Sequence, residues 1–259
     1  DQEYAHPWTP EPMGTEAERK AAAGKKIAVI GAGPGGLTAA LRLAQHGYTV
    51  TVCEKLPVPG GMMTVGIPEY RLPREPLLAE VANIQRAGVE IRYNQALGKD
   101  FTVDSLMEKD KFDAVILATG GKVARPAIPG IDCSRVCTFE DVLRCAVTGC
   151  EYYPADRQPP IECGPTVLIW GDHFAAADSA EKLAADGNKV YVVTENREFA
   201  QWMEPCHRDV MFKRFAGSNG EGLTGKPFQH TVTVIPNTTV LEIADSGEVT
   251  LLDHRFRKS

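Results

Sequence analysis

The stretch GAGPGG, residues 31–36, is the part of the sequence best suited to binding chemistry. It follows the apolar run KIAVI and opens a helix-forming segment. Gly31 permits a tight turn, Gly33 lets a pyrophosphate touch the backbone, and Gly36 lets the helix pack close to the strand. The helix N-terminus then offers free N–H groups and a favourable dipole to the phosphates. Glu54, 23 residues after Gly31, can accept hydrogen bonds from ribose hydroxyls, so the sequence predicts a dinucleotide site here.

A second copy of this pattern lies 140 residues further along the chain. Gly31 matches Gly171, and the match continues without a gap until just before the last strand of the copy. Two copies at this spacing predict two related nucleotide-binding domains. In the second copy His173 stands at the position of Gly33, and Asp172 precedes it. A side chain there would fill the space of the pyrophosphate, and the carboxylate would repel the phosphates.

The residues after the second strand of this copy bear on which nucleotide could bind. Thr194, Glu195 and Asn196 stand where an arginine pair would hold the 2′-phosphate of NADPH. The sequence therefore argues against NADPH in the usual pose. It leaves NADH, held through Glu195, as an open alternative.

Two further segments carry a family resemblance. Residues 24–55 followed by VPGGMMTVGIPEYRLP, residues 58–73, resemble the FAD-binding segment of the glutamate synthase small-subunit family, and dihydropyrimidine dehydrogenase has a similar segment. The resemblance implies that Gly60 and Gly61 pass the flavin side of FAD and that GIPEYRLP lines the cofactor. ILATGG, residues 116–121, is similar to the family's second flavin-side turn. The cofactor-binding residues expected from the glycine motif and this resemblance, which covers about residues 25–131, are Gly31, Gly33, Pro34, Gly35, Gly36, Glu54, Lys55, Gly60, Gly61, Met62, Ile67, Arg71, Leu97, Ala118, Thr119 and Gly120.

A second resemblance covers residues 180–215. This segment looks like the corresponding part of trimethylamine dehydrogenase-type flavoproteins, which are related to the old yellow enzymes. In trimethylamine dehydrogenase the domain pair no longer exchanges hydride with a nicotinamide. The resemblance implies that the second copy kept its fold and lost its dinucleotide function.

Composition is that of an ordinary globular protein. The chain has 259 residues, 43% hydrophobic and 24% charged, with a net charge of −6 that gives no reason to expect nucleic acid or an anionic membrane as partner. No apolar run approaches the roughly 20 residues needed to span a bilayer. No signal peptide is visible, and seven cysteines, an odd number, fit a reducing compartment, so we expect a cytoplasmic location.

The pattern of segments predicts an α/β fold with two Rossmann-like domains. We expect a linker or arm over residues 1–24, an FAD-binding domain over 25–150, and a degenerate NAD(P)-binding-like domain over 160–259. Within these, a buried strand should precede ILATGG, a helix should span residues 138–147, and residues 230–253 should form an antiparallel meander with a turn at 245–247. In the resembled families the chain returns to the FAD domain through a strand that ends in Gly-Asp, and the only Gly-Asp in this sequence, Gly171-Asp172, belongs to the second copy. We therefore expect another polypeptide to complete that domain.

Other chemistry finds little support in the residue pattern. The spacings between the cysteines at 133, 137, 145, 150 and 163 lack the C-x2-C pairs typical of iron–sulfur loops and of redox-active disulfides. His207 lacks metal-ligand spacing, and no catalytic group is recognisable, so we expect no metal site.

The sequence thus favours one function over two alternatives. The favoured hypothesis is an FAD-binding electron-transfer module of a multi-component oxidoreductase, exchanging electrons with a partner flavin or iron–sulfur centre. One alternative is an NADH-dependent flavin reductase component. The other, from a different class, is a non-redox scaffold subunit that binds only ADP.

Overall fold

The chain folds into two compact parts. The computed structural model describes residues 8–148, 163–217 and 228–256. Unit 1 extends to Lys122, and unit 2 begins at Val123. This boundary differs from the expected domain end at residue 150, because the segment after Lys122 pairs with unit 2. The Ile243 N–H donates to the Pro129 carbonyl at 3.0 Å, for example.

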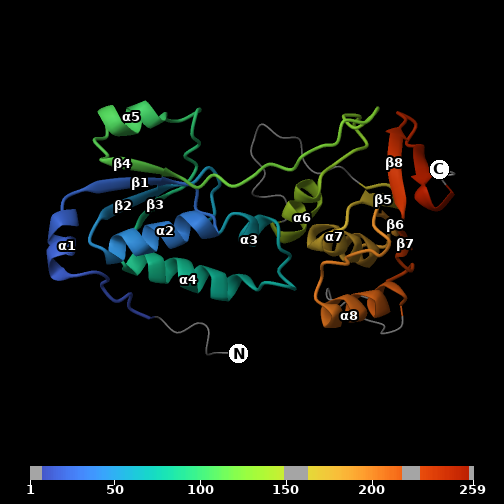
Figure 1. Ribbon diagram of the computed structural model, residues 1–259, viewed down its shortest axis with the longest axis horizontal. Helices are drawn as coiled ribbons and strands as arrows, with labels where there is room; N and C mark the ends of the chain where they lie inside the picture. The colour runs from blue at the N-terminus through green and yellow to red at the C-terminus, as the bar shows by residue number, and fades with distance from the viewer. Residues whose placement is uncertain (1–7, 149–162, 218–227, 257–259) are drawn as a thin grey trace. The chain divides into compact units, whose positions relative to one another are not determined.

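Unit 1 is a parallel sheet covered by helices on both faces (Figure 1). The strand order is β3-β2-β1-β4, and every described pair is parallel. The expected strand before ILATGG is β4, at one edge of this order and only half-buried, whereas we expected a buried strand. The elements are α1 (Glu16–Ala22), β1 (Lys26–Ile30), α2 (Pro34–Gln45), β2 (Thr49–Cys53), α3 (Met62–Val65), α4 (Arg74–Arg86), β3 (Glu90–Arg92), α5 (Val103–Glu108) and β4 (Ala114–Leu117).

Alternate side chains of β1 point to opposite faces of the sheet, as the two-residue period of a strand requires. Val29 is fully buried on the face covered by α2 and α4, where it meets Leu37 and Val81. Ala28 and Ile30 pack on the opposite face, under α5. Burial on both faces explains why β1 is apolar throughout after its first residue.

Residues 16–22, expected to be part of a linker or arm, form helix α1. A capping box starts it, in which the Glu18 N–H donates to Thr15 Oγ1 at 3.2 Å and the Thr15 N–H donates to Glu18 at 2.7 Å. The Met13 N–H donates to the Gln45 carbonyl at 2.9 Å, and Ala22 is buried. The described part of this segment therefore packs on unit 1 itself.

Unit 2 contains a parallel sheet of order β5-β6-β7 and a separate antiparallel hairpin, β8-β9. Its core joins α7, β6 and α8, where the rings of Phe199, Phe212 and Phe215 lie 6.3–6.5 Å apart. The elements are α6 (Phe139–Thr148), β5 (Thr166–Trp170), α7 (Phe174–Ala185), β6 (Lys189–Val193), α8 (Pro205–Phe215), β7 (Thr233–Ile235), β8 (Thr238–Ile243), β9 (Val249–Asp253) and the 3₁₀ turn η2 (His254–Phe256).

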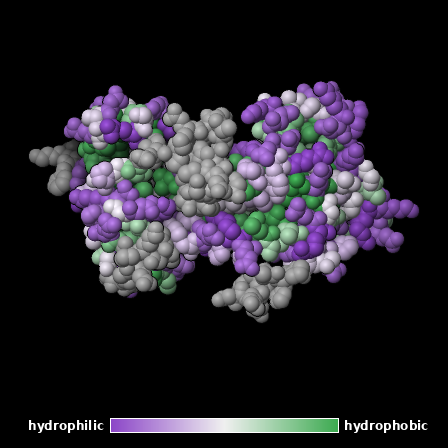
Figure 2. All heavy atoms as spheres, turned by 180° about the vertical axis from the view of Figure 1, so that it is seen from behind, coloured by the Kyte–Doolittle hydropathy of each residue, from purple (hydrophilic) through white to green (hydrophobic). Residues whose placement is uncertain are grey.

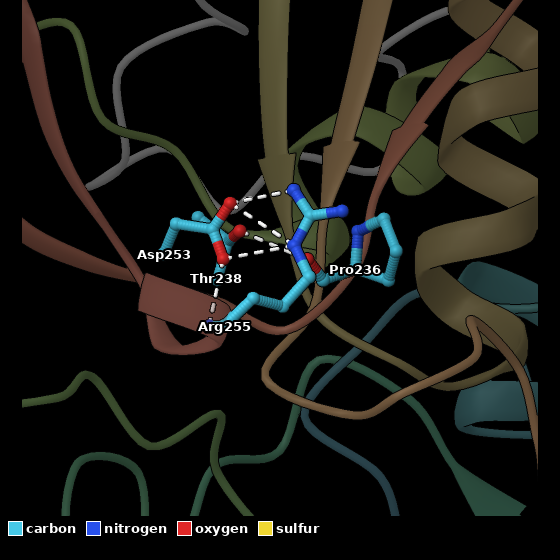
Figure 3. Close-up of polar contacts among 4 residues, drawn as sticks. All are labelled: Pro236, Thr238, Asp253 and Arg255. Atoms are coloured by element: carbon cyan, nitrogen blue, oxygen red, sulfur yellow. Dashed lines mark hydrogen bonds and ion pairs between the residues drawn. The ribbon is translucent and has the colours of Figure 1, made fainter. Parts of the chain in front are cut away.

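The expected meander is only partly correct. β8 and β9 form a hairpin around the predicted turn, but β7 pairs in parallel with β6. Our interpretation was wrong for β7 because alternation shows that a strand is half-buried and does not show which neighbour it pairs with. Figure 3 shows the end of the hairpin, where Arg255 holds Asp253 by paired hydrogen bonds, including Nη2 to Oδ2 at 2.5 Å, and Thr238 Oγ1 donates to the Pro236 carbonyl at 2.9 Å.

The repeat seen in the sequence is a repeat in the backbone. β5, α7 and β6 begin and end 140 residues after β1, α2 and β2, and the strand register is the same. The bond from Gly31 N–H to the Cys53 carbonyl, 2.8 Å, recurs from Gly171 to Val193 at 3.1 Å. The offset extends through the last strand, further than the sequence alone suggested.

Candidate functional site

The turn at residues 31–33 lies between the end of β1 and the start of α2. Gly31 has φ of 106°, and a Cβ there would clash with the Ala118 carbonyl oxygen. A Cβ on Gly36 would overlap the Gly31 carbonyl oxygen, so this glycine sets the close packing of helix on strand. Gly31 and Gly36 therefore serve the fold of the turn.

Gly33 is different, because no contact or backbone angle in the described protein requires a glycine at this position. Its φ and ψ, −77° and 179°, suit any residue, and a Cβ there would meet no protein atom within 4 Å beyond its chain neighbours. Gly35 has equally open space, and Pro34 begins α2. The helix N-terminus thus faces a gap that a side chain at Gly33 would fill, as a pyrophosphate cradle requires.

Glu54 follows β2 and is almost completely buried, with 4% of its surface exposed. Oε2 accepts from the Ala32 N–H at 2.6 Å, and Oε1 accepts from the Leu56 N–H at 2.8 Å. A carboxylate has about four acceptor positions, so these two bonds leave capacity for ribose hydroxyls. The carboxylate also ties the glycine turn to the end of β2.

The Gly60–Gly61 pair packs directly on the glycine turn, although 26 residues lie between Gly33 and Gly60. The Gly60 N–H donates to the Ala32 carbonyl at 2.7 Å, and a Cβ on Gly61 would lie 2.9 Å from the Gly33 Cα. Both glycines have positive φ, 100° and 54°. The structure therefore brings together the two glycine motifs and Glu54, which lie at separate places in the sequence.

The turn after β4 borders the same place. The Ala118 N–H donates to the Ile30 carbonyl at 2.9 Å, and the Ala118 carbonyl is the group that a Cβ on Gly31 would strike. Thr119 and Gly120 are exposed, and Gly120 has φ of 71°. The C-terminal ends of β1, β2 and β4 thus converge at one edge of the sheet, where open α/β sheets bind ligands.

Five further expected residues lie in the same unit, and their burial does not decide a role in cofactor binding. Met62, Ile67 and Leu97 are 41%, 36% and 38% exposed, and Lys55 is exposed. Arg71 is half-buried, and its N–H donates to the Pro68 carbonyl at 2.9 Å. Figure 2 shows apolar patches within a largely hydrophilic surface, so exposed apolar side chains alone do not mark a flavin site. Cofactor contacts of these five residues stay predictions.

Two residues of this region were not anticipated from the sequence. Tyr93 follows β3 beside β2, and burial together with the charge of Glu54 raises the pKa of its phenol. Arg74 at the start of α4 donates to the carbonyls of Met63, Leu72 and Ile67 at 2.8, 2.9 and 2.5 Å, and burial lowers its pKa. Arg74 therefore holds residues 62–72 in place. Tyr93 could have been suspected from its position at a strand end.

The corresponding turn of unit 2 has another arrangement. His173 is the residue before the first turn of α7 and has an extended backbone, as Gly33 has in unit 1; its exposed side chain makes no capping hydrogen bond. The Asp172 carboxylate accepts from the Ala200 N–H at 2.6 Å and from Asn196 Nδ2 at 2.5 Å. Asp172 is thus hydrogen-bonded to the loop after β6, and its expected repulsion of phosphates stays a prediction.

Metal sites and clusters find no support in the described ranges, where no three His, Cys, Asp or Glu residues gather as metal ligands. The cysteines described at 53, 133, 137, 163 and 206 are free thiols. Of the two others, Cys150 lies outside the described residues, and nothing is described of the Cys145 side chain. No helix among the described residues is long and apolar enough to cross a membrane.

The fold and the glycine site define an oxidoreductase domain of the flavin and pyridine nucleotide class. Two βαβ units of the same geometry stand in succession, and in the first the space around Gly33 is open. The chain belongs to the pyridine nucleotide-disulphide oxidoreductase family, whose sequence profile matches residues 25–255. The predicted fold class, two Rossmann-like domains, is confirmed.

Curated relatives are subunits of larger enzymes. The chain is 50% identical over 118 residues to the NADP(+)-dependent formate dehydrogenase subunit beta of Moorella thermoacetica, covering 45% of this chain and 16% of the relative. It is 33% identical over 227 residues to the NAD-dependent dihydropyrimidine dehydrogenase subunit PreT of Escherichia coli O157:H7, covering 87% and 51%. It is 35% identical over 244 residues to the glutamate synthase [NADPH] small chain of Mycobacterium tuberculosis strain CDC 1551 / Oshkosh, covering 91% and 50%. The chain thus spans about half, or less, of each relative.

Solved structures share the fold. A 2-naphthoyl-CoA reductase matches 98% of this chain and 32% of its own, with a TM-score of 0.68 at 24% identity. Histamine dehydrogenase from Rhizobium sp. 4-9 matches 95% and 36%, with a TM-score of 0.64 at 22% identity. Both resemblances expected from the sequence, to glutamate synthase small subunits and to trimethylamine dehydrogenase-type flavoproteins, are confirmed.

Proposed function

We propose that this chain is an FAD-binding electron-transfer module of a larger oxidoreductase. The observation that carries the proposal is the cradle around Gly33, where space for a side chain is left open at a helix N-terminus beside a buried carboxylate. Gly31–Gly36 and Glu54 would hold the ADP half of FAD, and Gly60–Gly61 would lie beside the flavin half. When bound, the isoalloxazine would supply the one- and two-electron chemistry.

The chain's own residues would bind and orient the cofactor. The free N–H groups at the start of α2 would donate to the pyrophosphate, and the spare acceptor positions of Glu54 would take the ribose hydroxyls. Arg74 would keep the 62–72 segment beside the site through its three carbonyl contacts.

Partners follow from the relatives, whose names describe subunits. We propose that electrons pass between this chain's flavin and a flavin or iron–sulfur centre on another polypeptide or domain. The names of the relatives cite NADP(+), NAD and NADPH in turn, so they do not choose a nicotinamide. For unit 2 we propose that neither NADH nor NADPH binds in the usual pose. The exposed His173 side chain extends from the position that is a bare glycine in unit 1.

The test is the cofactor content of the purified chain. We expect flavin absorption bands, FAD as the released cofactor by mass spectrometry, and no bleaching by NADPH at useful rates. A colourless protein that releases ADP would instead identify a scaffold. Bleaching by NADH in the absence of partners would identify a flavin reductase. Either result would overturn the proposal.

A reciprocal exchange at the two matched positions sharpens this test. Gly33→His gives unit 1 the residue of unit 2 and should abolish FAD retention in a folded chain. His173→Gly gives unit 2 the residue of unit 1 and should raise nicotinamide affinity if that side chain is the obstacle. Normal flavin content in Gly33→His would place the cofactor elsewhere.

A further inference from the structure

Unit 2 contains a pocket of about 370 Å³ beside the end of β6. That volume lies within the range of sites that hold small molecules. Three segments form its walls: the loop after β6, helix α8, and β7 with the residue that follows it. None of the described lining residues belongs to the turn before α7, where the pyrophosphate of a dinucleotide would lie. The pocket therefore does not include the His173 position.

Hydrogen bonds fix the loop that forms the first wall. The Asn237 N–H donates to the Asn196 carbonyl at 2.9 Å, which joins the start of the loop to the segment after β7. At the other end of the loop, the Ala200 N–H donates to Asp172 Oδ1 at 2.6 Å. Because the loop is held at both ends, the pocket exists before any ligand arrives. Little additional ordering would then oppose binding.

Much of the lining is apolar, and all three walls contribute to it. The apolar lining residues are Phe199, Pro205, Phe212, Val234 and Pro236, the last of which Figure 3 labels. The Phe199 and Phe212 rings meet edge to face with their centroids 6.5 Å apart, and this contact joins the loop to α8. Such a lining favours an aromatic ring as ligand, because contacts between rings add to the burial of apolar surface.

Charged residues also line the pocket, and all but one have a partner of opposite charge. Arg208 Nη1 lies 3.0 Å from Glu198 Oε2. Asp209 Oδ2 lies 2.7 Å from Lys213 Nζ on the same helix. Arg197, which is exposed, has no hydrogen-bond or ion-pair partner among the residues that the structure describes. The lining thus has one uncompensated positive charge, on a guanidinium whose donors can bind both oxygens of a carboxylate.

We propose that this pocket binds a small aromatic monocarboxylate. The ring lies against Phe199 and Phe212, and the carboxylate pairs with Arg197. A phosphate monoester carries roughly 1.5–2 negative charges at neutral pH. It would be repelled by the carboxylates of Glu198 and Asp209, which also line the pocket, so a single carboxylate is the better match.

Titration of the whole purified chain with indole-3-acetate, followed by ligand-observed NMR, tests the proposal. Indole-3-acetamide is the neutral isostere, and adenosine 5′-monophosphate represents a phosphate ligand. We expect a Kd of about 1 mM or below for the carboxylate, as for other ligands of this size. The amide should bind roughly tenfold more weakly, because it loses the charged hydrogen bonds to Arg197. Equal or tighter binding of the amide or of the monophosphate would overturn the proposal.

Substitutions at Arg197 locate the site. Arg197→Gln removes the charge without removing a contact within the described protein, so thermal unfolding should not change. The variant should bind indole-3-acetate about tenfold more weakly and the amide as wild type does. Arg197→Lys keeps the charge without the paired donors and should lose less. Arg135→Gln is the matched control, since Arg135 is an exposed arginine of unit 2 outside the lining. An unchanged Kd in Arg197→Gln, or displacement of indole-3-acetate by NADH or NADPH, would contradict the assignment.

Discussion

Replacing Gly33 with alanine should separate cofactor binding from folding. A Cβ at this position meets no other part of the described protein, and the backbone conformation is one that alanine adopts readily. The substitution should therefore leave the apoprotein as stable as before, or more stable by about 0.4–1 kcal/mol through the lower entropy of the unfolded chain. The added methyl group occupies the space proposed for the pyrophosphate.

The loss of affinity can be worked from the bonds at stake. Moving the pyrophosphate away from the start of α2 forfeits at least one hydrogen bond between a backbone N–H and a charged group, a contribution of about 1.5–3 kcal/mol. Since about 1.4 kcal/mol corresponds to a tenfold change, Kd for FAD should rise roughly 10- to 150-fold. Binding and stability should thus change in opposite directions.

Titration calorimetry of the apoprotein with FAD measures the first quantity, and thermal unfolding without cofactor measures the second. Gly36→Ala is the contrasting variant, because its Cβ would overlap the Gly31 carbonyl oxygen and should destabilise the apoprotein by about 1–3 kcal/mol. Gly164→Ala is the matched control, since its Cβ also meets open space but lies in unit 2. An unchanged Kd for Gly33→Ala, or an apoprotein less stable than wild type, would refute the reasoning.

Three further variants test single contacts. Glu54→Gln should lower the free energy of unfolding by about 1–3 kcal/mol in urea titrations, because an amide cannot accept from both backbone N–H groups; unchanged stability would contradict those bonds. Arg214→Met should cost about 3–5 kcal/mol, since Glu181 is 1% exposed and bonded to Arg214 Nε at 2.8 Å, and adding Glu181→Leu should recover most of the loss. Arg255 lowers the pKa of Asp253 from 3.8 to about 2, so the stability that Asp253 contributes is present above pH 4 and is lost as the pH falls toward 2. The difference between wild type and Asp253→Asn in thermal unfolding should shrink over that range, and a constant difference would count against the contact.

The sequence determined the parts of the fold that depend on local pattern. The glycine turn, the helix that follows it and the acid after the second strand lie within about 25 residues, and their spacing reflects one βαβ unit. The family resemblance drew attention to Gly60 and Gly61, but the contact of Gly61 with Gly33 was not predicted, because no periodicity links those positions. The grouping of α6 with unit 2 and the parallel pairing of β7 were missed, since both depend on contacts between distant segments. The role of Arg74 was missed for a related reason. Its hydrogen-bond acceptors are backbone carbonyls, which every residue has, so the sequence does not show which of them it bonds.

The two βαβ units differ in one contact that bears on the proposed loss of nucleotide binding in unit 2. In both units a carboxylate links the turn after the first strand to the segment after the second strand. The carboxylate follows the second strand in unit 1 and the first strand in unit 2. In unit 1 Glu54 reaches back to the Ala32 N–H from the second strand; in unit 2 Asp172, which occupies the position of Ala32, reaches forward to Ala200. The position of Glu54 is then taken by Thr194.

The exchange keeps the link between the turn and the loop but changes the groups that unit 2 would offer to a ribose. The turn of unit 2 stays tied to its neighbouring loop through Asp172. The Thr194 hydroxyl is uncharged and already accepts from the Asn196 N–H at 3.1 Å, so it is a weaker acceptor for ribose hydroxyls than the Glu54 carboxylate. The exposed His173 extends from the position that is bare at Gly33. Because each change supports the other, restoring glycine at His173 alone should recover only part of the dinucleotide affinity. Full recovery would require an acid at Thr194 and the removal of the carboxylate at Asp172.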